Sequence, residues 1–271
     1  MKKYFPIVLL SLWPVISSAD LALPPPMEST QSFDIQLSKN EAQSIGERIW
    51  QNEGAGKVEN LIVWNEAEDF PSLGIGHFIW YPAGVEGPFV ESFPALLRHL
   101  RKETVIPNWL SGVEDAPWSS RAEFYRDINS WRMHELRDLM KHTMPQQVAF
   151  IVQRLEAALP KMLATLKSEQ QRSDVEQQFY RVAQSSNGIY ALIDYVNFKG
   201  EGVSPSERYR GEGWGLLQVL QMMKINDGNV MRAFSRAADA VLTRRVSNAP
   251  RDESRWLAGW RKRTASYGLK L

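Results

Sequence analysis

A carboxylate at the end of a predicted helix is the first candidate for chemistry. Glu53 stands in Asn52-Glu53-Gly54, where a helix that begins near Ser38 should end. The last turn of a helix exposes carbonyl oxygens and the negative end of the helix dipole, so this position favours the neutral form of a carboxyl group. A carboxyl that stays protonated can act as a general acid. An exposed glutamate at a fraying helix end is the alternative, and Glu53 alone does not decide between the two.

Further carboxylates follow in one predicted turn. Glu66, Glu68 and Asp69 lie between two short apolar runs, and Glu59 precedes them. A second carboxylate that faces the helix end would position a water molecule or stabilise a developing positive charge. A solvated turn explains the same residues. A Ca²⁺ loop does not, because it needs a stricter ligand spacing and an interior glycine.

Two glycines and a histidine interrupt the run that follows this turn. Gly74, Gly76 and His77 lie in a strand-like stretch, 73–80, whose other positions are mostly apolar. Glycine within a strand allows a ligand or another backbone to approach closely. His77 would act as a general base or, more commonly for a lone histidine on a strand, as a buried hydrogen-bonding group that braces the hairpin.

Other catalytic chemistries lack their motifs in this chain. There is no Gly-x-Ser-x-Gly, no His-Glu-x-x-His and no glycine-rich loop of the kind that binds phosphate. The absence of cysteine excludes disulfides, thiolate nucleophiles and cysteine zinc sites. We therefore expect neither a metal nor an organic cofactor.

The elements that must position Glu53 and the acidic turn come early in the chain. Ser38 and Glu41 form a capping box that begins a helix, and Gly54 should end it. Residues 60–80 contain the β structure, as two short runs of strand-forming residues separated by the acidic turn.

The rest of the chain, from about residue 89, has helical spacing of apolar residues. A nearly continuous apolar helix at 190–198 is the best candidate for a buried centre. The sequence predicts a mainly α (α+β) fold, with a small lobe at about 34–86 and a larger all-helical lobe at about 87–271. A cleft between two such lobes is a common place for a ligand.

The first residues predict export. Residues 1–19 combine a basic start, a short apolar run and a Ser-Ser-Ala end, as a cleaved signal peptide does. The apolar run is shorter than the roughly 20 residues of a membrane span. Residues 20–33 contain three consecutive prolines and predict an extended linker. We expect a periplasmic protein with no stable membrane insertion after signal cleavage.

The charge of the chain is nearly balanced. The 32 Lys and Arg residues stand against 31 Asp and Glu residues, and residues 1–19 hold two of the lysines and no acid, so the remainder has a net charge of −1. This balance gives no reason to expect binding to nucleic acid. From residue 231 onward, ten basic residues stand against three acidic ones. A basic stretch of this kind suits an anionic substrate or a solvated helical surface.

The order of these features resembles the phage-type lysozymes, and the chain is similar to an exported bacterial member of the lysozyme-like superfamily. That family has a catalytic Glu at a helix end, followed by Gly, and then a hairpin with the pattern aromatic-x-Asp-x-x-Gly-x-x-Thr-x-Gly-x-Gly-His. The resemblance implies that Glu53 is the general acid, Glu66 the second carboxylate and Ser72 the active-site hydroxyl. Trp64, Gly74, Gly76 and His77 match the remaining positions of the hairpin.

Two later blocks support the resemblance. Residues 191–201 are similar to the family's central buried helix and its glycine-containing exit, and residues 243–250 are similar to the family's C-terminal helical region. In that family an arginine pairs with the catalytic Glu, which implies Arg251 or Arg255 here. The predicted substrate-binding residues are Trp64, Gly76, His77, Phe78, Trp80, Asn197 and Phe198.

The function that the resemblance implies is cleavage of the β-1,4 glycan strands of peptidoglycan by a monomeric enzyme. Two residues depart from the pattern, because Glu66 stands where the family has Asp and Asp69 stands where it has Gly. Glu68 or Asp69 is therefore also a candidate for the second carboxylate. The alternatives are a lytic transglycosylase, a chitinase-like glycosidase, and a non-catalytic glycan-binding protein of the same fold.

Overall fold

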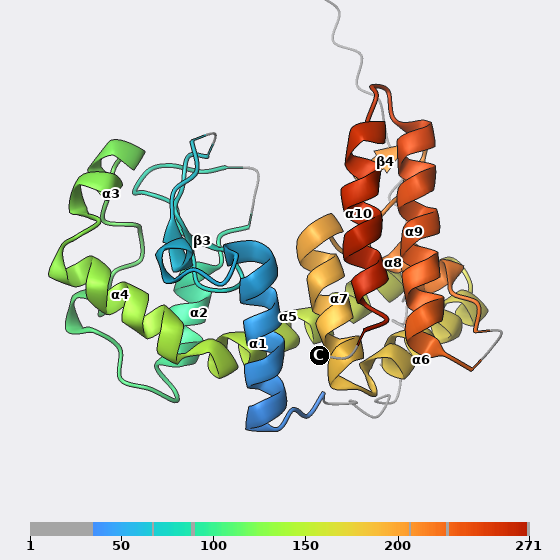
Figure 1. Ribbon diagram of the computed structural model, residues 1–271, viewed down its shortest axis with the longest axis horizontal. Helices are drawn as coiled ribbons and strands as arrows, with labels where there is room; N and C mark the ends of the chain where they lie inside the picture. Colours follow the sequence, from blue (N-terminus) through green and yellow to red (C-terminus); the bar gives the residue numbers. More distant parts are fainter. Residues whose placement is uncertain (1–34, 67, 88–89, 206, 226–227, 270–271) are drawn as a thin grey trace, which may run out of the picture. The chain divides into compact units, whose positions relative to one another are not determined.

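The computed structural model describes residues 35–66, 68–87, 90–205, 207–225 and 228–269 (Figure 1). The predicted signal peptide at 1–19 and the predicted linker at 20–33 lie outside the described residues. The fold is mainly helical with small antiparallel sheets, as the sequence predicts. The α-helices are α1 Lys39–Gly54, α2 Phe93–Leu100, α3 Arg121–Asp127, α4 Trp131–His142, α5 Met144–Ala164, α6 Glu169–Ala183, α7 Ser186–Lys199, α8 Leu216–Met222, α9 Val230–Asn248 and α10 Ser254–Ser266.

The helix that carries Glu53 begins where the capping box predicts. The Ser38 hydroxyl accepts a hydrogen bond from the Glu41 amide, and the Glu41 carboxylate accepts one from the Ser38 amide at 2.9 Å. These bonds satisfy amide groups that the first helical turn leaves without partners. The helix ends at Ala55, whose φ of 52° is left-handed. α1 packs mainly against α5 and α7.

The first sheet consists of three very short strands, β1 Ile62–Val63, β2 Ser72–Leu73 and β3 Phe78–Ile79, in antiparallel order β1-β2-β3. The predicted continuous strand at 73–80 is therefore wrong. Residues between β2 and β3 form a tight turn, because Gly74 has a φ of 70° and His77 a φ of 48°. Left-handed backbone at two positions cannot continue a strand.

The later part of the chain contains the predicted buried helix and one unpredicted hairpin. In α7 the side chains from Ile189 to Tyr195 are all buried, and the helix contacts α1, α5, α6 and α8. The prediction of an all-helical second lobe is wrong at β4 Arg208–Tyr209 and β5 Glu212–Gly213, which pair antiparallel. Their turn places Arg210 and Gly211 at φ values of 52° and 81°. Positive φ at both central residues is the geometry of tight hairpins.

The last two long helices, α9 and α10, lie side by side (Figure 1). α10 contributes few buried side chains apart from Thr264, so most of its surface is available to solvent or to neighbouring polar groups. In the described ranges every helix is too short or too polar to span a bilayer. The division into lobes at about 34–86 and 87–271 stays a prediction.

Candidate active site

Glu53 lies in the last turn of α1, at the position that the sequence predicts for the general acid. Its side chain is 24% exposed, so it is neither free in solvent nor buried. The turn is held by Asn60, whose amide nitrogen donates to the Gly54 carbonyl at 2.9 Å. Gly54 is needed here because a Cβ would lie 2.7 Å from the Trp50 ring.

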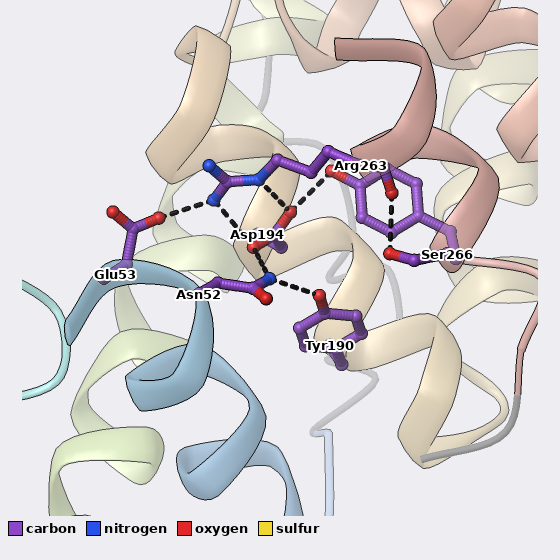
Figure 2. A network of polar contacts seen from close by, with 7 residues as sticks. Asn52, Glu53, Tyr190, Asp194, Arg263 and Ser266 are labelled. Carbon is purple, nitrogen blue, oxygen red and sulfur yellow. Dashed lines mark hydrogen bonds and ion pairs between the residues drawn. The ribbon is translucent and has the colours of Figure 1, made fainter. Parts of the chain in front are cut away.

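The arginine that pairs with Glu53 is Arg263 on α10. Its Nη2 donates to Oε1 of Glu53 (Figure 2) at 2.5 Å. The prediction that Arg251 or Arg255 makes this pair is wrong. Arg251 is exposed ahead of α10, and Arg255 is exposed in the first helical turn, where its guanidinium lies 4.7 Å from the Trp256 ring centroid. Eight residues separate Arg255 from Arg263, which is about 12 Å along a helix axis.

Asp194 on α7 holds the same arginine from the other side. Its side chain is 1% exposed. Arg263 donates to it through Nε and Nη2, both at 2.8 Å, and the hydroxyl of Tyr267 donates at 2.6 Å. Nδ2 of Asn52 lies 3.0 Å from Oδ1 of Asp194 and 2.7 Å from the hydroxyl of Tyr190 (Figure 2). Asp194 is therefore a buried carboxylate with several donors, and one guanidinium bridges it to Glu53.

The electrostatics of this network follow from burial and from the two carboxylates. Burial opposes the charge of Arg263, but the hydrogen bonds and charge of Asp194, with those of Glu53, outweigh burial and raise the pKa of Arg263 above its ordinary value. Burial, together with Asp194, raises the pKa of Tyr267 and of Tyr190. Both hydroxyls therefore keep their protons near neutral pH, and Arg263 keeps its charge.

Sequence reasoning missed Asp194 and Arg263 as parts of the site. A signal for Asp194 was present, because it is an acid within the nearly continuous apolar helix at 190–198, and a buried charge requires a partner. Arg263 was one of ten basic residues after residue 231, and nothing in the sequence distinguishes it from the other nine.

Aromatic and basic groups surround the network. The guanidinium of Arg263 lies 4.4 Å from the centroid of the Phe198 ring, so one predicted substrate-binding residue adjoins the partner of Glu53. Asn197, another predicted binding residue, is exposed beside it on α7. An open cavity of about 300 Å³ lies at the network. Its lining residues are Arg48, Asn52, Gly259, Lys262, Arg263 and Ser266.

Three aromatic residues predicted to contact sugar are instead part of the core. Trp64, Phe78 and Trp80 are 3%, 1% and 0% exposed. The ring of Trp80 packs against Phe93 with centroids 4.7 Å apart. The indole N–H groups of Trp64 and Trp80 donate to backbone carbonyls, each at 2.7 Å, so both rings are satisfied inside the protein. The prediction for these three residues is wrong because neighbouring helices cover the face on which they lie.

The turn around Gly76 and His77 is braced by a glutamine rather than by His77. Gln147 of α5 is fully buried; its Oε1 accepts from the Ile75 amide at 3.0 Å, and its Nε2 donates to the Met140 carbonyl at 2.6 Å. Gly74 is required because a Cβ would collide with Gln147. His77 is half-buried, and within the described ranges its side chain has no hydrogen bond.

The predicted second carboxylate and its helper make no hydrogen bond or ion pair with the network in the part of the chain that the structure describes. Glu66 is exposed, and among the described residues no hydrogen bond or ion pair joins it to Glu53 or to Arg263. Ser72 is 3% exposed within β2. Glu68 accepts from the amide of Asn65 at 3.0 Å, which is a contact within its own turn.

The geometry offers one carboxylate, Glu53, at the edge of a buried ion-pair network, where proton donation to a ligand oxygen is chemically possible. In the part of the chain that the structure describes, no group of three or more His, Asp or Glu residues could hold a metal ion. Comparison with known proteins supplies no relative, since no family model matches the chain and no curated protein or solved structure is significantly similar to it.

Proposed function

We propose that this protein is an exported, periplasmic glycosidase that cleaves the glycan strands of peptidoglycan, with Glu53 as general acid. The observation that carries the proposal is the bridge from Glu53 through Arg263 to the buried Asp194. A glutamate that is only an exposed residue at a helix end would be solvated by water. It would not require an arginine that links it to a buried carboxylate 141 residues further along the chain. The sequence pattern from Glu53 to His77 supports the same assignment.

The bridge suits a residue that must gain and lose a proton. When Glu53 gives its proton to a glycosidic oxygen, the resulting carboxylate is stabilised by the guanidinium that already contacts it. Asp194 shares the guanidinium through two hydrogen bonds, so the three groups carry a net charge of −1 when both acids are ionised and become neutral when Glu53 is protonated.

A lytic transglycosylase is the second candidate, and the burial of Ser72 favours it. Hydrolysis with inversion requires a second carboxylate that activates water on the far side of the sugar ring. Ser72, the hydroxyl expected to assist that water, is buried within β2. In a transglycosylase the sugar's own hydroxyl closes an anhydro ring, and one acid suffices. The chitinase-like and non-catalytic alternatives have no observation of this kind in their favour.

The experiment is digestion of purified peptidoglycan sacculi by the mature protein, with the product ends identified by mass spectrometry. Reducing ends indicate hydrolysis, and anhydro ends, lighter by one water, indicate ring closure. Glu53→Gln should abolish release of soluble fragments. Glu47→Gln is the matched control, because Glu47 is an exposed residue of the same helix whose one hydrogen bond among the described residues is with Gln43. Full activity of Glu53→Gln, or no release by the unaltered protein, would refute the proposal.

A further inference from the structure

Lys199, the last residue of α7, lies between two aromatic rings. Its Nζ is 3.6 Å from the centroid of Trp260 on α10 and 4.0 Å from the centroid of Phe198. Ammonium groups are attracted to ring faces at such distances. The helix ends directly afterwards, since Gly200 has a φ of 81°. The backbone therefore fixes the lysine at the junction of α7 and α10.

The neighbouring cations have carboxylate partners, whereas Lys199 has none in the described ranges. Arg245 donates to Glu253 at 2.9 Å. Its guanidinium lies 5.1 Å from the ring centroid of Trp260, one of the two rings that flank Lys199. Arg263 is paired with Asp194 and Glu53. Within the residues that the structure describes, Nζ of Lys199 lies over the two rings and forms no hydrogen bond or ion pair, so its three hydrogen-bond donors are unused.

The surroundings make the unpaired charge of Lys199 costly. Burial is the main cause that lowers its pKa to about 7, Arg245 and Arg263 lower it further, and Glu253 partly opposes them. An anion placed against Nζ would reverse this effect, because an opposite charge at contact distance stabilises the ammonium form. Lys199 itself thus lacks a carboxylate at contact distance in the described ranges.

This position is next to the proposed reaction centre. The Phe198 ring contacts both Lys199 and Arg263, at 4.0 and 4.4 Å, and Arg263 contacts Glu53. Phe198 and Trp260 are both half-buried, so each retains some exposed surface, and aromatic rings are suitable platforms for sugar rings. A glycan strand bound at Glu53 would therefore pass close to Lys199.

We propose that Lys199, flanked by Phe198 and Trp260, forms a subsite that binds a carboxylate substituent of the glycan strand next to the bond on which Glu53 acts. The inference rests on the proposed function, because it takes the strand to be the ligand. The carboxylate has two possible sources: the lactyl group of the muramic acid sugar, or the peptide that this sugar bears. Either would place a carboxylate against Nζ and accept hydrogen bonds from the unused donors of Lys199.

The test measures binding rather than cleavage, using the Glu53→Gln protein so that no substrate is consumed. Three probes differ in charge: the neutral disaccharide of N-acetylglucosamine, the disaccharide of N-acetylglucosamine and N-acetylmuramic acid with a free lactyl carboxylate, and the same disaccharide carrying its peptide. Calorimetry should show that at least one acidic probe binds about tenfold or more tightly than the neutral probe, as expected for a charge-assisted hydrogen bond. The stronger acidic probe identifies the source of the carboxylate.

Lys199→Met, added to Glu53→Gln, should remove this preference and leave binding of the neutral probe unchanged. Lys161→Met is the matched control, because Lys161 is an exposed lysine of α5 far along the chain from the site, and it should keep the preference. Equal binding of all three probes, or an acidic preference that survives Lys199→Met, would overturn the proposal.

A second measurement does not depend on the folding of the lysine variant. In the Glu53→Gln protein with ¹³C-labelled lysine, NMR follows the titration of Lys199, and the acidic probe should shift its midpoint to higher pH while the neutral probe should not. An unchanged midpoint would contradict the subsite. If the unaltered protein fails to cleave sacculi but the acidic preference and the shift are present, the proposed function fails and the subsite stands.

Discussion

Two groups of carboxylates in this protein are held in opposite ways. Glu53 and Asp194 share Arg263, and the partners come from α1, α7 and α10, up to 210 residues apart. Glu66 and Glu68 lie in one loop between β1 and β2, where Glu68 bonds to a residue three positions away and Glu66 is exposed. The acidic loop is conspicuous in the sequence, and the network is not.

The difference shows what sequence spacing can and cannot report about a site. Carboxylates that are close in sequence repel one another and are most easily solvated, so their clustering is weak evidence of a common task. When carboxylates from distant parts of the chain share one guanidinium, their ion pairs must offset the cost of removing these charges from water. This requires a defined geometry. The four predictions below test the contrast, from the largest expected effect to the smallest.

Asp194→Ala should have the largest effect on stability. The substitution leaves Arg263 partly buried with only the half-exposed Glu53 as partner, and removing one member of a buried ion pair costs about 3–5 kcal/mol of unfolding free energy. Urea denaturation measures the loss. Asp239→Ala is the control, because the Asp239–Arg261 pair is solvent-exposed on both sides and should be worth about 1 kcal/mol or less. Equal losses would mean that the network has no special role in the fold.

Gln147→Leu should destabilise the protein by about 2 kcal/mol, since it leaves the Ile75 amide and the Met140 carbonyl without their buried partner. The loss should loosen the turn between β2 and β3, which amide hydrogen exchange of Ile75 would detect. Gln170→Leu, at an exposed glutamine whose side chain bonds, within the described ranges, to Asp174 alone, should change stability by no more than about 0.5 kcal/mol. Retained protection of the Ile75 amide would contradict this role of Gln147.

Lys199→Met should change how stability depends on pH. Because the pKa of Lys199 is lowered to about 7 in the folded protein from 10.5, the unfolded chain binds more protons between these values. Stability therefore rises as pH increases from about 7 to about 10.5, and below pH 7 the full cost of the buried charge remains. The variant should lack this rise. Thermal melts at intervals across this range measure it, and parallel curves for the two proteins would refute it.

Glu66→Gln should have the smallest effect on stability, within about 0.5 kcal/mol, because the side chain is exposed and joined to nothing in the described ranges. Its effect on sacculus digestion shows whether the acidic loop takes part in the reaction together with Glu53. Activity close to that of the unaltered protein would support Glu53 as the one essential acid. A loss as large as that of Glu53→Gln would bring the acidic loop back into the reaction and favour hydrolysis.

The parts of the fold that follow local rules could be predicted from the sequence. The capping box of Ser38 and Glu41 and the glycine at 54 placed Glu53 in the last turn of α1. The apolar run at 190–198 marked the buried helix, although the acid within it, Asp194, was not recognised as part of the site. Helix starts and apolar periodicity depend on residues a few positions apart, which is why they can be read without a structure.

The parts that depend on distant partners could not be predicted. The strand expected at 73–80 is broken at Gly74 and His77, and the glutamine that braces the turn is Gln147, on another helix. The burial of Trp80 depends on the Phe93 ring on α2. The arginine that pairs with Glu53 is determined by how α10 is rotated about its axis and how far it is shifted along that axis. Periodicity along the helix specifies neither.

The pairing of Glu53 with Arg263 also has a consequence for biosynthesis. Chains are made from the N-terminus, and Arg263 is added 210 residues after Glu53. Any nascent or prematurely terminated chain shorter than 263 residues lacks the guanidinium that joins Glu53 to Asp194. The ion-pair network therefore cannot form during translation until Arg263 has been added to the chain.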